Sequence, residues 1–159
     1  MKFSTTLLSL LPAALTLAAP SGLERRQSSG SSSLSYDPRY DVGGTSLNDV
    51  SCSTGDFGLI TEGFTDFQSL PTFPLIGGTP TIAGFNSPQC GACYEVSYTS
   101  ATGASNSITI IGIDASPGGF NVGQQAMDTL TGNRAVELGR VDVTWTQVGR
   151  DRCGLTPRK

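Results

Sequence analysis

Ser107-Ile108-Thr109-Ile110-Ile111-Gly112-Ile113-Asp114-Ala115-Ser116-Pro117-Gly118-Gly119-Phe120-Asn121-Val122 is the stretch that decides the fold. Successive side chains of an extended chain point to opposite faces, so Ile108 and Ile110 share one face while Ile111 and Ile113 share the other. A strand that is apolar on both faces belongs inside a barrel or a sandwich and not on a solvated edge. The stretch therefore predicts a buried central strand, a Pro-Gly-Gly turn and then a helix.

Two polar residues flank the turn at the end of this strand. Asp114 is the first charged residue after the apolar run, so we expect it at the rim of a cavity or groove, where a rigid scaffold often carries binding residues. Asn121 lies across the turn, and its amide can form hydrogen bonds but cannot transfer a proton. Two structural alternatives stay open: Asp114 as a turn or capping residue, and Asn121 as the N-cap of the helix that follows.

The start of the chain has the pattern of a secretory leader. Residues 1–19 combine a weakly positive start, an apolar run from Leu7 to Leu17 and the small residues Ala18-Ala19, which is typical of a cleaved signal peptide. The apolar run is too short to span a bilayer, and no later run is longer, so no membrane segment is expected. We therefore expect a secreted, extracellular protein, associated in part with cell walls.

A second cut is predicted a few residues later. The pair Arg25-Arg26 would end a propeptide over residues 20–26 and leave Gln27 as the new N-terminus, the alternative being a solvated charge pair. Residues 27–33 are Ser-rich with no apolar side chain to bury, so a disordered tail is expected there. The remaining residues, 34–159, have the length of one ordinary domain.

The charge of the chain narrows the range of partners. The whole chain has 10 Lys and Arg and 13 Asp and Glu, a formal net charge of -3. Loss of residues 1–26 removes Lys2, Arg25, Arg26 and Glu24, which leaves 7 basic and 12 acidic residues and a net charge of -5. An acidic protein is poorly suited to nucleic acid or anionic membranes, and it is compatible with neutral polymers such as glycans.

Cys52, Cys90, Cys93 and Cys153 behind a signal peptide predict two disulfides, with three pairings possible. The short spacing of Cys90 and Cys93 also fits a thiol redox motif, but the thioredoxin-like setting that such a motif needs is missing. The protein contains no histidine and its thiols are accounted for, so no metal site and no cofactor are expected.

The rest of the chain predicts mainly short strands. Residues 94–99 alternate cleanly and form a hairpin with the central strand, and residues 140–148 predict a last strand with Trp145 in the core. A short helix is expected over residues 123–130, ending at Gly132. These elements predict a small β-barrel with insertions.

The region from Ser46 up to the hairpin is rich in Pro, Gly and aromatic residues. Ser46 is expected to cap one helical turn. The region from Phe57 onward should be a packed loop with short strands, in which Ile82 and Phe85 point inward.

The residue types exclude several reaction classes. Without histidine, Ser-His-Asp and Cys-His schemes cannot operate. A glycosidase needs two carboxyl groups that face one bond. Asp114 is one candidate, and the conceivable partners are Asp37, Asp56, Glu62 and Asp66.

Several motifs together resemble the cerato-platanins, small secreted proteins of filamentous fungi, over residues 34–153. The motifs are Ser35-Tyr36-Asp37-Pro38, Cys52-Ser53-x-Gly55-Asp56-x-Gly58-Leu59, Ile82-Ala83-Gly84-Phe85, Asn86-Ser87-Pro88-Gln89-Cys90-Gly91-x-Cys93, Asp114-x-x-x-Gly118-Gly119-Phe120-Asn121 and Gly139-Arg140-Val141-Asp142.

The resemblance implies a mostly β, single-domain, six-stranded double-psi β-barrel with short helices and two disulfides, paired Cys52–Cys90 and Cys93–Cys153. It also implies kinship with the first domain of expansins and with endoglucanases on the same barrel. Asp114 matches the family's carboxylate on a shallow groove, and Asn121 falls where expansins have their second aspartate, which argues against hydrolysis. Phe85 stands where the family often has tryptophan.

The resulting prediction is a secreted, non-hydrolytic carbohydrate-binding protein with expansin-like loosening and plant-defence elicitor activity. Its ligands would be chitin oligosaccharides and cellulosic cell-wall polysaccharide. The expected binding residues are Asp114, Asn121, Tyr36, Ser53, Gly55 and Asp56. A weak endoglucanase is the alternative. The protein is expected to be a monomer that can self-assemble at interfaces and be recognised by a plant surface receptor.

Overall fold

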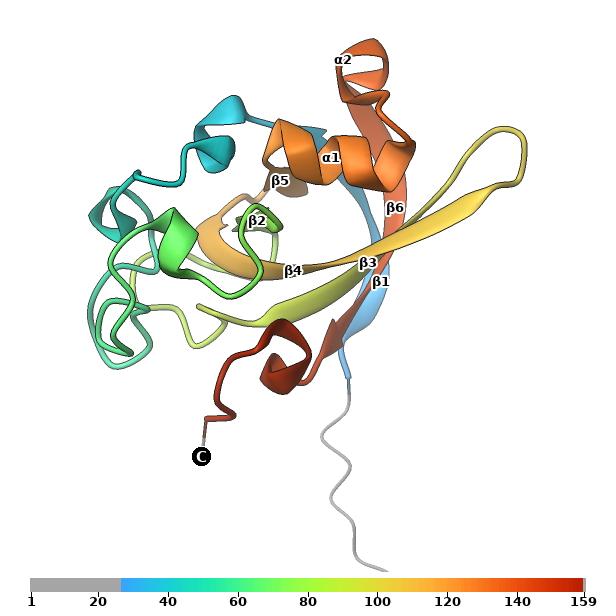
Figure 1. Cartoon of the computed structure of the whole chain (residues 1–159). Helices are drawn as coiled ribbons and strands as arrows, with labels where there is room; N and C mark the ends of the chain where they lie inside the picture. The colour runs from blue at the N-terminus through green and yellow to red at the C-terminus, as the bar shows by residue number, and fades with distance from the viewer. Residues whose placement is uncertain (1–26, 159) are drawn as a thin grey trace, which may run out of the picture.

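A computed structural model describes residues 27–158 as one closed barrel of six strands in the order β1-β5-β2-β4-β3-β6 (Figure 1). The strands are β1 (Ser29–Tyr36), β2 (Ile76–Thr79), β3 (Cys93–Thr99), β4 (Ser105–Ala115), β5 (Phe120–Val122) and β6 (Arg140–Val148). The helices are α1 (Gln124–Thr131) and α2 (Ala135–Leu138), and the 3-10 helices are η1 (Pro38–Asp41), η2 (Leu47–Asp49), η3 (Phe67–Ser69) and η4 (Arg150–Cys153). The predicted double-psi β-barrel is confirmed. None of the described helices is long and apolar enough to cross a membrane.

Strand β4 is buried on both faces, as its isoleucine pattern predicts. Ile108 and Ile110 belong to the barrel interior, together with residues of β1, β3, β5 and α1. Ile111 and Ile113 belong to a second cluster, formed with the loops that precede β3. Those loops gather on one side of the barrel in Figure 1. Each fully buried isoleucine stabilises the fold by about 1.5–3 kcal/mol, so β4 joins the two halves of the core.

The loops between β1 and β3, residues 37–92, form an outer loop layer that is held by local caps and by one of the two disulfides. Ser46 caps η2 as predicted, by accepting a hydrogen bond from the Asn48 N–H. Asp66 caps η3 in a capping box with Ser69. The disulfides join Cys52 to Cys90 and Cys93 to Cys153, which is the pairing implied by the resemblance.

The prediction of a disordered tail over residues 27–33 is wrong for the part from Ser29 onward. Ser29 to Ser33 form the first half of β1 and pair with β6 between Thr146 and Asp142. Gly30 pairs with Trp145 in this register and lies against its indole ring. The composition of residues 27–33 gives no sign of a strand, because the partner, β6, lies more than 100 residues away and is brought alongside by closure of the barrel. The barrel therefore begins at Ser29, while the predicted leader and propeptide lie outside the described residues.

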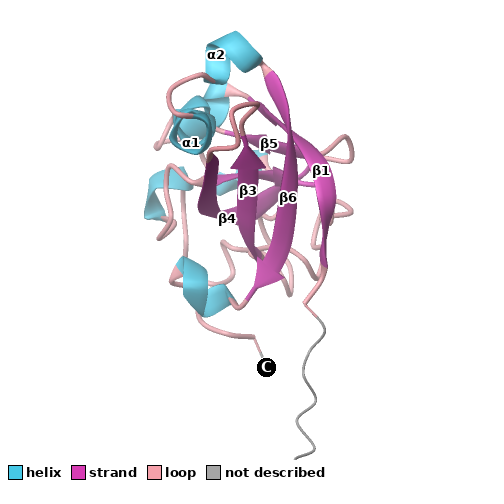
Figure 2. Ribbon diagram, turned by 90° about the vertical axis from the view of Figure 1, so that its right-hand side faces the viewer, coloured by secondary structure: helices cyan, strands magenta, loops and turns pink. Residues whose placement is uncertain are grey.

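The C-terminal elements agree with the sequence prediction. Helix α1 ends at Gly132, which has a left-handed backbone, and β6 covers the predicted residues 140–148. Trp145 packs edge-on against Tyr94 and Phe120, with ring centroids 5.8 and 6.0 Å away. Figure 2 shows α1 and α2 together at one end of the barrel, away from the C-terminus.

The prediction that Ile82 and Phe85 both point inward is correct for the first residue and wrong for the second. Ile82 is buried as expected, but Phe85 is 66% exposed. Its neighbours Gly84 and Asn86 both have positive φ, at 148° and 55°, so the chain turns sharply on either side of Phe85. The turn sends this aromatic side chain outward instead of into the core.

Candidate functional site

A bulge in β4 directs Asp114 to the outer face of the barrel. Pairing with β2 runs up to Gly112 and resumes at Asp114, so Ile113 is left out. A bulge interrupts the alternation of a strand and redirects the side chain that follows. Without it, Asp114 would share the inner face with Ile110 and Gly112. With it, Asp114 contacts Tyr40 in the outer loop layer.

The register brings five residues of neighbouring strands into one line on this outer face. Asp114 pairs with Gly78, Gly78 with Asn121, Asn121 with Ser35, and Ser35 with Arg140. We call these five residues the polar row. Gly78 lies between Asp114 and Asn121 and is buried under Ser116, because an added Cβ would lie only 2.9 Å from the Ser116 Cβ.

The Asp114 carboxylate is held by four hydrogen bonds. Its Oδ1 accepts from the Ser51 N–H at 3.0 Å, the Ser51 hydroxyl at 2.6 Å and the Ala115 N–H at 2.9 Å. Its Oδ2 accepts only from the Tyr40 hydroxyl, at 3.3 Å. A carboxylate oxygen offers about two acceptor positions, so Oδ1 is saturated and Oδ2 can accept a further bond from a ligand.

Tyr40, which donates to Asp114, is itself held in place by its neighbours. Its ring stacks on Phe67 with centroids 5.9 Å apart, and the Arg39 guanidinium lies 5.4 Å from its ring centre. Burial, and secondarily the nearby Asp114 carboxylate, raise the pKa of Tyr40 well above its ordinary value of 10.0. The phenol therefore stays protonated and continues to donate its hydrogen bond to Asp114 in mildly alkaline solution.

A fall in stability above about pH 10 is expected from this shift. Tyr40 keeps its proton in the folded state while an unfolded chain releases it, so the stabilisation is complete below pH 10 and is lost as pH rises further. Burial raises the pKa of Tyr94 in the same direction. Thermal unfolding between pH 9 and pH 11 measures the effect, and Tyr40→Phe should flatten part of the decline. An equal slope in wild type and variant would contradict the assignment to Tyr40.

Asn121 faces outward and is not the N-cap of α1. Its Oδ1 accepts from the Ser35 hydroxyl at 3.3 Å, and within residues 27–158 its amide NH2 donates to no other residue. The start of α1 is capped instead by Asp41, whose carboxylate accepts from the N–H groups of Gln124 and Gln125 at 2.8 and 3.2 Å. The amide of Asn121 is therefore available to a ligand.

The turn around Gly55 lies beside the polar row and not in it. Ser53 is buried and Asp56 exposed, and neither contacts Asp114. Gly55 packs closely on Asn86, since an added Cβ would lie 2.5 Å from the Asn86 Oδ1. The structure thus brings Asp114 and Asn121 together but places the expected residues 53–56 in a neighbouring turn.

Tyr36 lies on the opposite face of β1 from Ser35. It pairs with Val122 and packs against the barrel interior, so it does not line the polar row. The tyrosine at the site is Tyr40, and Ser51 and Gly78 are the other residues that the sequence prediction missed. The Gly77-Gly78 doublet beside a predicted strand was the one available signal, because such glycines mark a close approach of backbones.

Each conceivable carboxyl partner of Asp114 is engaged elsewhere or exposed. Asp37 and Asp66 cap 3-10 helices, Glu62 pairs with two arginines, and Asp56 lies in its exposed turn. None of their carboxylates forms a hydrogen bond with Asp114 or with its partners Ser51, Ala115 and Tyr40. Within residues 27–158 no group of three His, Cys, Asp or Glu side chains could hold a metal ion.

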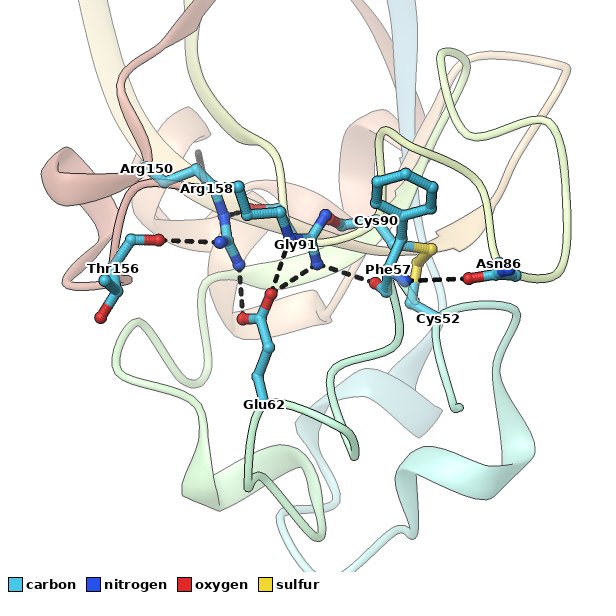
Figure 3. A network of polar contacts seen from close by, with 9 residues as sticks. All are labelled: Cys52, Phe57, Glu62, Asn86, Cys90, Gly91, Arg150, Thr156 and Arg158. Atoms are coloured by element: carbon cyan, nitrogen blue, oxygen red, sulfur yellow. Dashed lines mark hydrogen bonds and ion pairs between the residues drawn. A yellow bond between two sulfur atoms is a disulfide. The ribbon is translucent and has the colours of Figure 1, made fainter. Parts of the chain in front are cut away.

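A cavity of about 640 Å³ opens at a different place, beside the C-terminal segment, and neither Asp114 nor Asn121 lines it. Arg150 and Arg158 line it, but both guanidinium groups bind Glu62, each at 2.6 Å, as Figure 3 shows. Their other donors go to the backbone carbonyls of Phe57, Cys90, Gly91 and Thr156. We assign this network a structural role, because it fastens the C-terminal segment to the loop layer.

Glu62→Ala is expected to lower the free energy of unfolding by about 2 kcal/mol, because it leaves two half-buried guanidinium groups without a counter-charge. Urea denaturation measures the change. Glu137→Ala is the matched control: it breaks an exposed ion pair with Arg134 and should leave stability nearly unchanged. Equal stability of the two variants would show that the network holds nothing together.

The closed barrel, with its polar residues on an open outer face and its loops fixed by two disulfides, defines a double-psi β-barrel protein with a surface site. A family model described as Cerato-platanin matches residues 32–155. The chain belongs to the cerato-platanin family.

Individual relatives agree with this assignment. The chain is 49% identical to "Allergen Asp f 15" of Aspergillus fumigatus over 96% of this chain and 97% of that protein. It resembles the crystal structure of cerato-platanin 2 from M. perniciosa with a TM-score of 0.75 and 49% identity, over 79% of this chain and all of that one. The solution structure of the fungal elicitor cerato-platanin matches with a TM-score of 0.64 and 45% identity, over 76% and 95% of the two chains.

Proposed function

We propose that the protein is a secreted, non-hydrolytic carbohydrate-binding protein whose ligands are neutral chitin or cellulose-type oligosaccharides. The observation that carries the proposal is the polar row, in which the register places a carboxylate acceptor and an amide donor on either side of Gly78 on the same outer face. Sugar hydroxyls both donate and accept hydrogen bonds, so Asp114 Oδ2 and the Asn121 amide match them in complementary ways.

The geometry also favours binding over bond cleavage. Hydrolysis of a glycosidic bond requires a proton donor as well as a nucleophile or base, usually two carboxyl groups that face each other. Opposite Asp114 across Gly78 stands Asn121, whose amide cannot transfer a proton. The alternative, a weak endoglucanase, would need a second carboxyl group, and the candidates named by the sequence are engaged elsewhere or exposed.

Loosening of cellulosic material and elicitation of plant defence follow from the same proposal. A protein that competes for the hydroxyl groups of packed polysaccharide chains can separate them without cleavage. The solution structure cited above is described as that of a fungal elicitor, which supports an elicitor role for this chain. We propose that the mature protein acts outside the cell as a monomer, with a plant surface receptor as a further partner.

An NMR titration of ¹⁵N-labelled protein with chitin and cello-oligosaccharides, paired with a reducing-sugar assay, tests the proposal. Shifts should concentrate on the amide of Asn121 and on the backbone of Ser51, Gly78 and Asp114, and no reducing ends should appear. Shifts confined to other parts of the barrel would remove the site, and new reducing ends that depend on Asp114 would establish the endoglucanase.

A further inference from the structure

Among residues 27–158, Phe85 is the most exposed aromatic residue, with a relative exposure of 66%. A single exposed apolar residue is common on protein surfaces and by itself indicates nothing. Two further observations set Phe85 apart: the turn that carries it is firmly anchored, and the anchor is shared with the site residue Asp114.

The anchor consists of backbone and side-chain bonds on the C-terminal side of Phe85. Asn86, with φ at 55°, donates its N–H to the Ser51 carbonyl at 3.3 Å. Its Oδ1 accepts from the Phe57 N–H at 2.9 Å, a contact visible in Figure 3. Gly55 packs against the same side chain. The aromatic ring is therefore presented by a turn of defined shape, so ordering it on binding a ligand costs little.

Ser51 connects this turn to the polar row. Its carbonyl accepts from Asn86, while its N–H and hydroxyl both donate to Asp114 Oδ1. One residue thus lies between the carboxylate and the residue next to Phe85. Asn86 and Ser51 thus fix the position of the exposed ring relative to Asp114.

We propose that Phe85 is an aromatic platform that extends the glycan site, so that the site takes a β-linked oligomer of several rings and not a monosaccharide. The inference rests on the proposed function. A phenyl ring has no hydrogen-bonding group, so it selects the part of a ligand that exposes C–H groups. Pyranose rings whose hydroxyls are equatorial, as in chitin and cellulose, present axial C–H groups on both faces. A chain of such rings can stack on Phe85 while a neighbouring ring bonds to Asp114 and Asn121.

Three variants distinguish the effect of the aromatic ring on binding from the effect of an apolar side chain. Phe85→Ala removes the platform, Phe85→Leu keeps an apolar side chain without a ring, and Phe85→Tyr keeps the ring. We expect the Ala and Leu variants to bind a chitin tetramer about tenfold more weakly and the Tyr variant to bind it like wild type. N-acetylglucosamine alone, which the proposal expects to bind weakly at most, should show no difference among the four proteins. Since Phe85 is mostly exposed, unfolding temperatures should not change.

A second measurement is independent of affinity. In the wild-type complex, NOEs are expected between the Phe85 ring protons and the C–H protons of the tetramer.

The outcomes distinguish this inference from the proposed function. If wild type binds the tetramer and Asp114→Asn weakens binding, but Phe85→Ala or Phe85→Leu binds like wild type, the platform is rejected and the glycan site stands. Loss of affinity in Phe85→Tyr, or absence of the NOEs, also rejects the platform. If wild type binds no glycan at all, the proposed function fails and the platform fails with it.

Discussion

Asp114→Asn is expected to weaken binding of chitin or cellulose oligomers about 10- to 100-fold. A hydrogen bond from a sugar hydroxyl to a charged acceptor contributes about 1.5–3 kcal/mol, and most of that is lost when the acceptor becomes a neutral amide. The oxygen that can accept from the sugar is Oδ2, since three donors already occupy Oδ1 and only Tyr40 donates to Oδ2. Isothermal titration calorimetry with a chitin tetramer measures the change.

Asparagine is the informative replacement, because alanine would alter the fold as well as the site. The Asp114 carboxylate accepts from Ser51, Ala115 and Tyr40, and its complete removal would leave half-buried donors unpaired, at about 1–3 kcal/mol of stability. Asp142→Asn is the control for charge, since Asp142 is exposed on β6 and lies outside the polar row. An Asp114→Asn variant with the affinity and the NMR shifts of wild type would remove Asp114 from the site.

Loss of the Cys93–Cys153 disulfide is expected to lower the free energy of unfolding by about 4 kcal/mol. The bridge closes a loop of 60 residues, and an unfolded chain without it gains the corresponding entropy. Both cysteines are buried, and Cys153 ends η4, which begins with Arg150. The disulfide therefore also positions the C-terminal segment that Glu62 fastens to the loop layer.

Guanidinium denaturation of the Cys93→Ser/Cys153→Ser protein measures this contribution. The Cys52→Ser/Cys90→Ser protein is the internal comparison: its loop spans 38 residues, so a similar loss of about 4 kcal/mol is expected. A loss below about 1 kcal/mol in either protein would mean that packing alone holds together the two segments that the bridge joins.

The isoleucines of β4 could be placed from the sequence, whereas the residues of the outer loops could not. Alternation correctly predicted which isoleucines share a face, and the family resemblance correctly predicted the barrel and the disulfide pairing. Tyr36 and Tyr40 could not be told apart in this way. They lie four positions apart in a short segment, and their surroundings depend on where η1 turns the chain after β1.

The features that could be predicted without the structure are local: the apolar faces of strands and helices, the Ser46 cap and the family motifs. These depend on the spacing of side chains along the chain, which any reader of the sequence can follow. Only the tertiary structure decided that Ser29 to Ser33 form a strand, that a bulge turns Asp114 outward, and that Ser51 joins it to the Phe85 turn. Each of these depends on a partner dozens of residues away, and the pairing of distant segments is set by closure of the whole barrel.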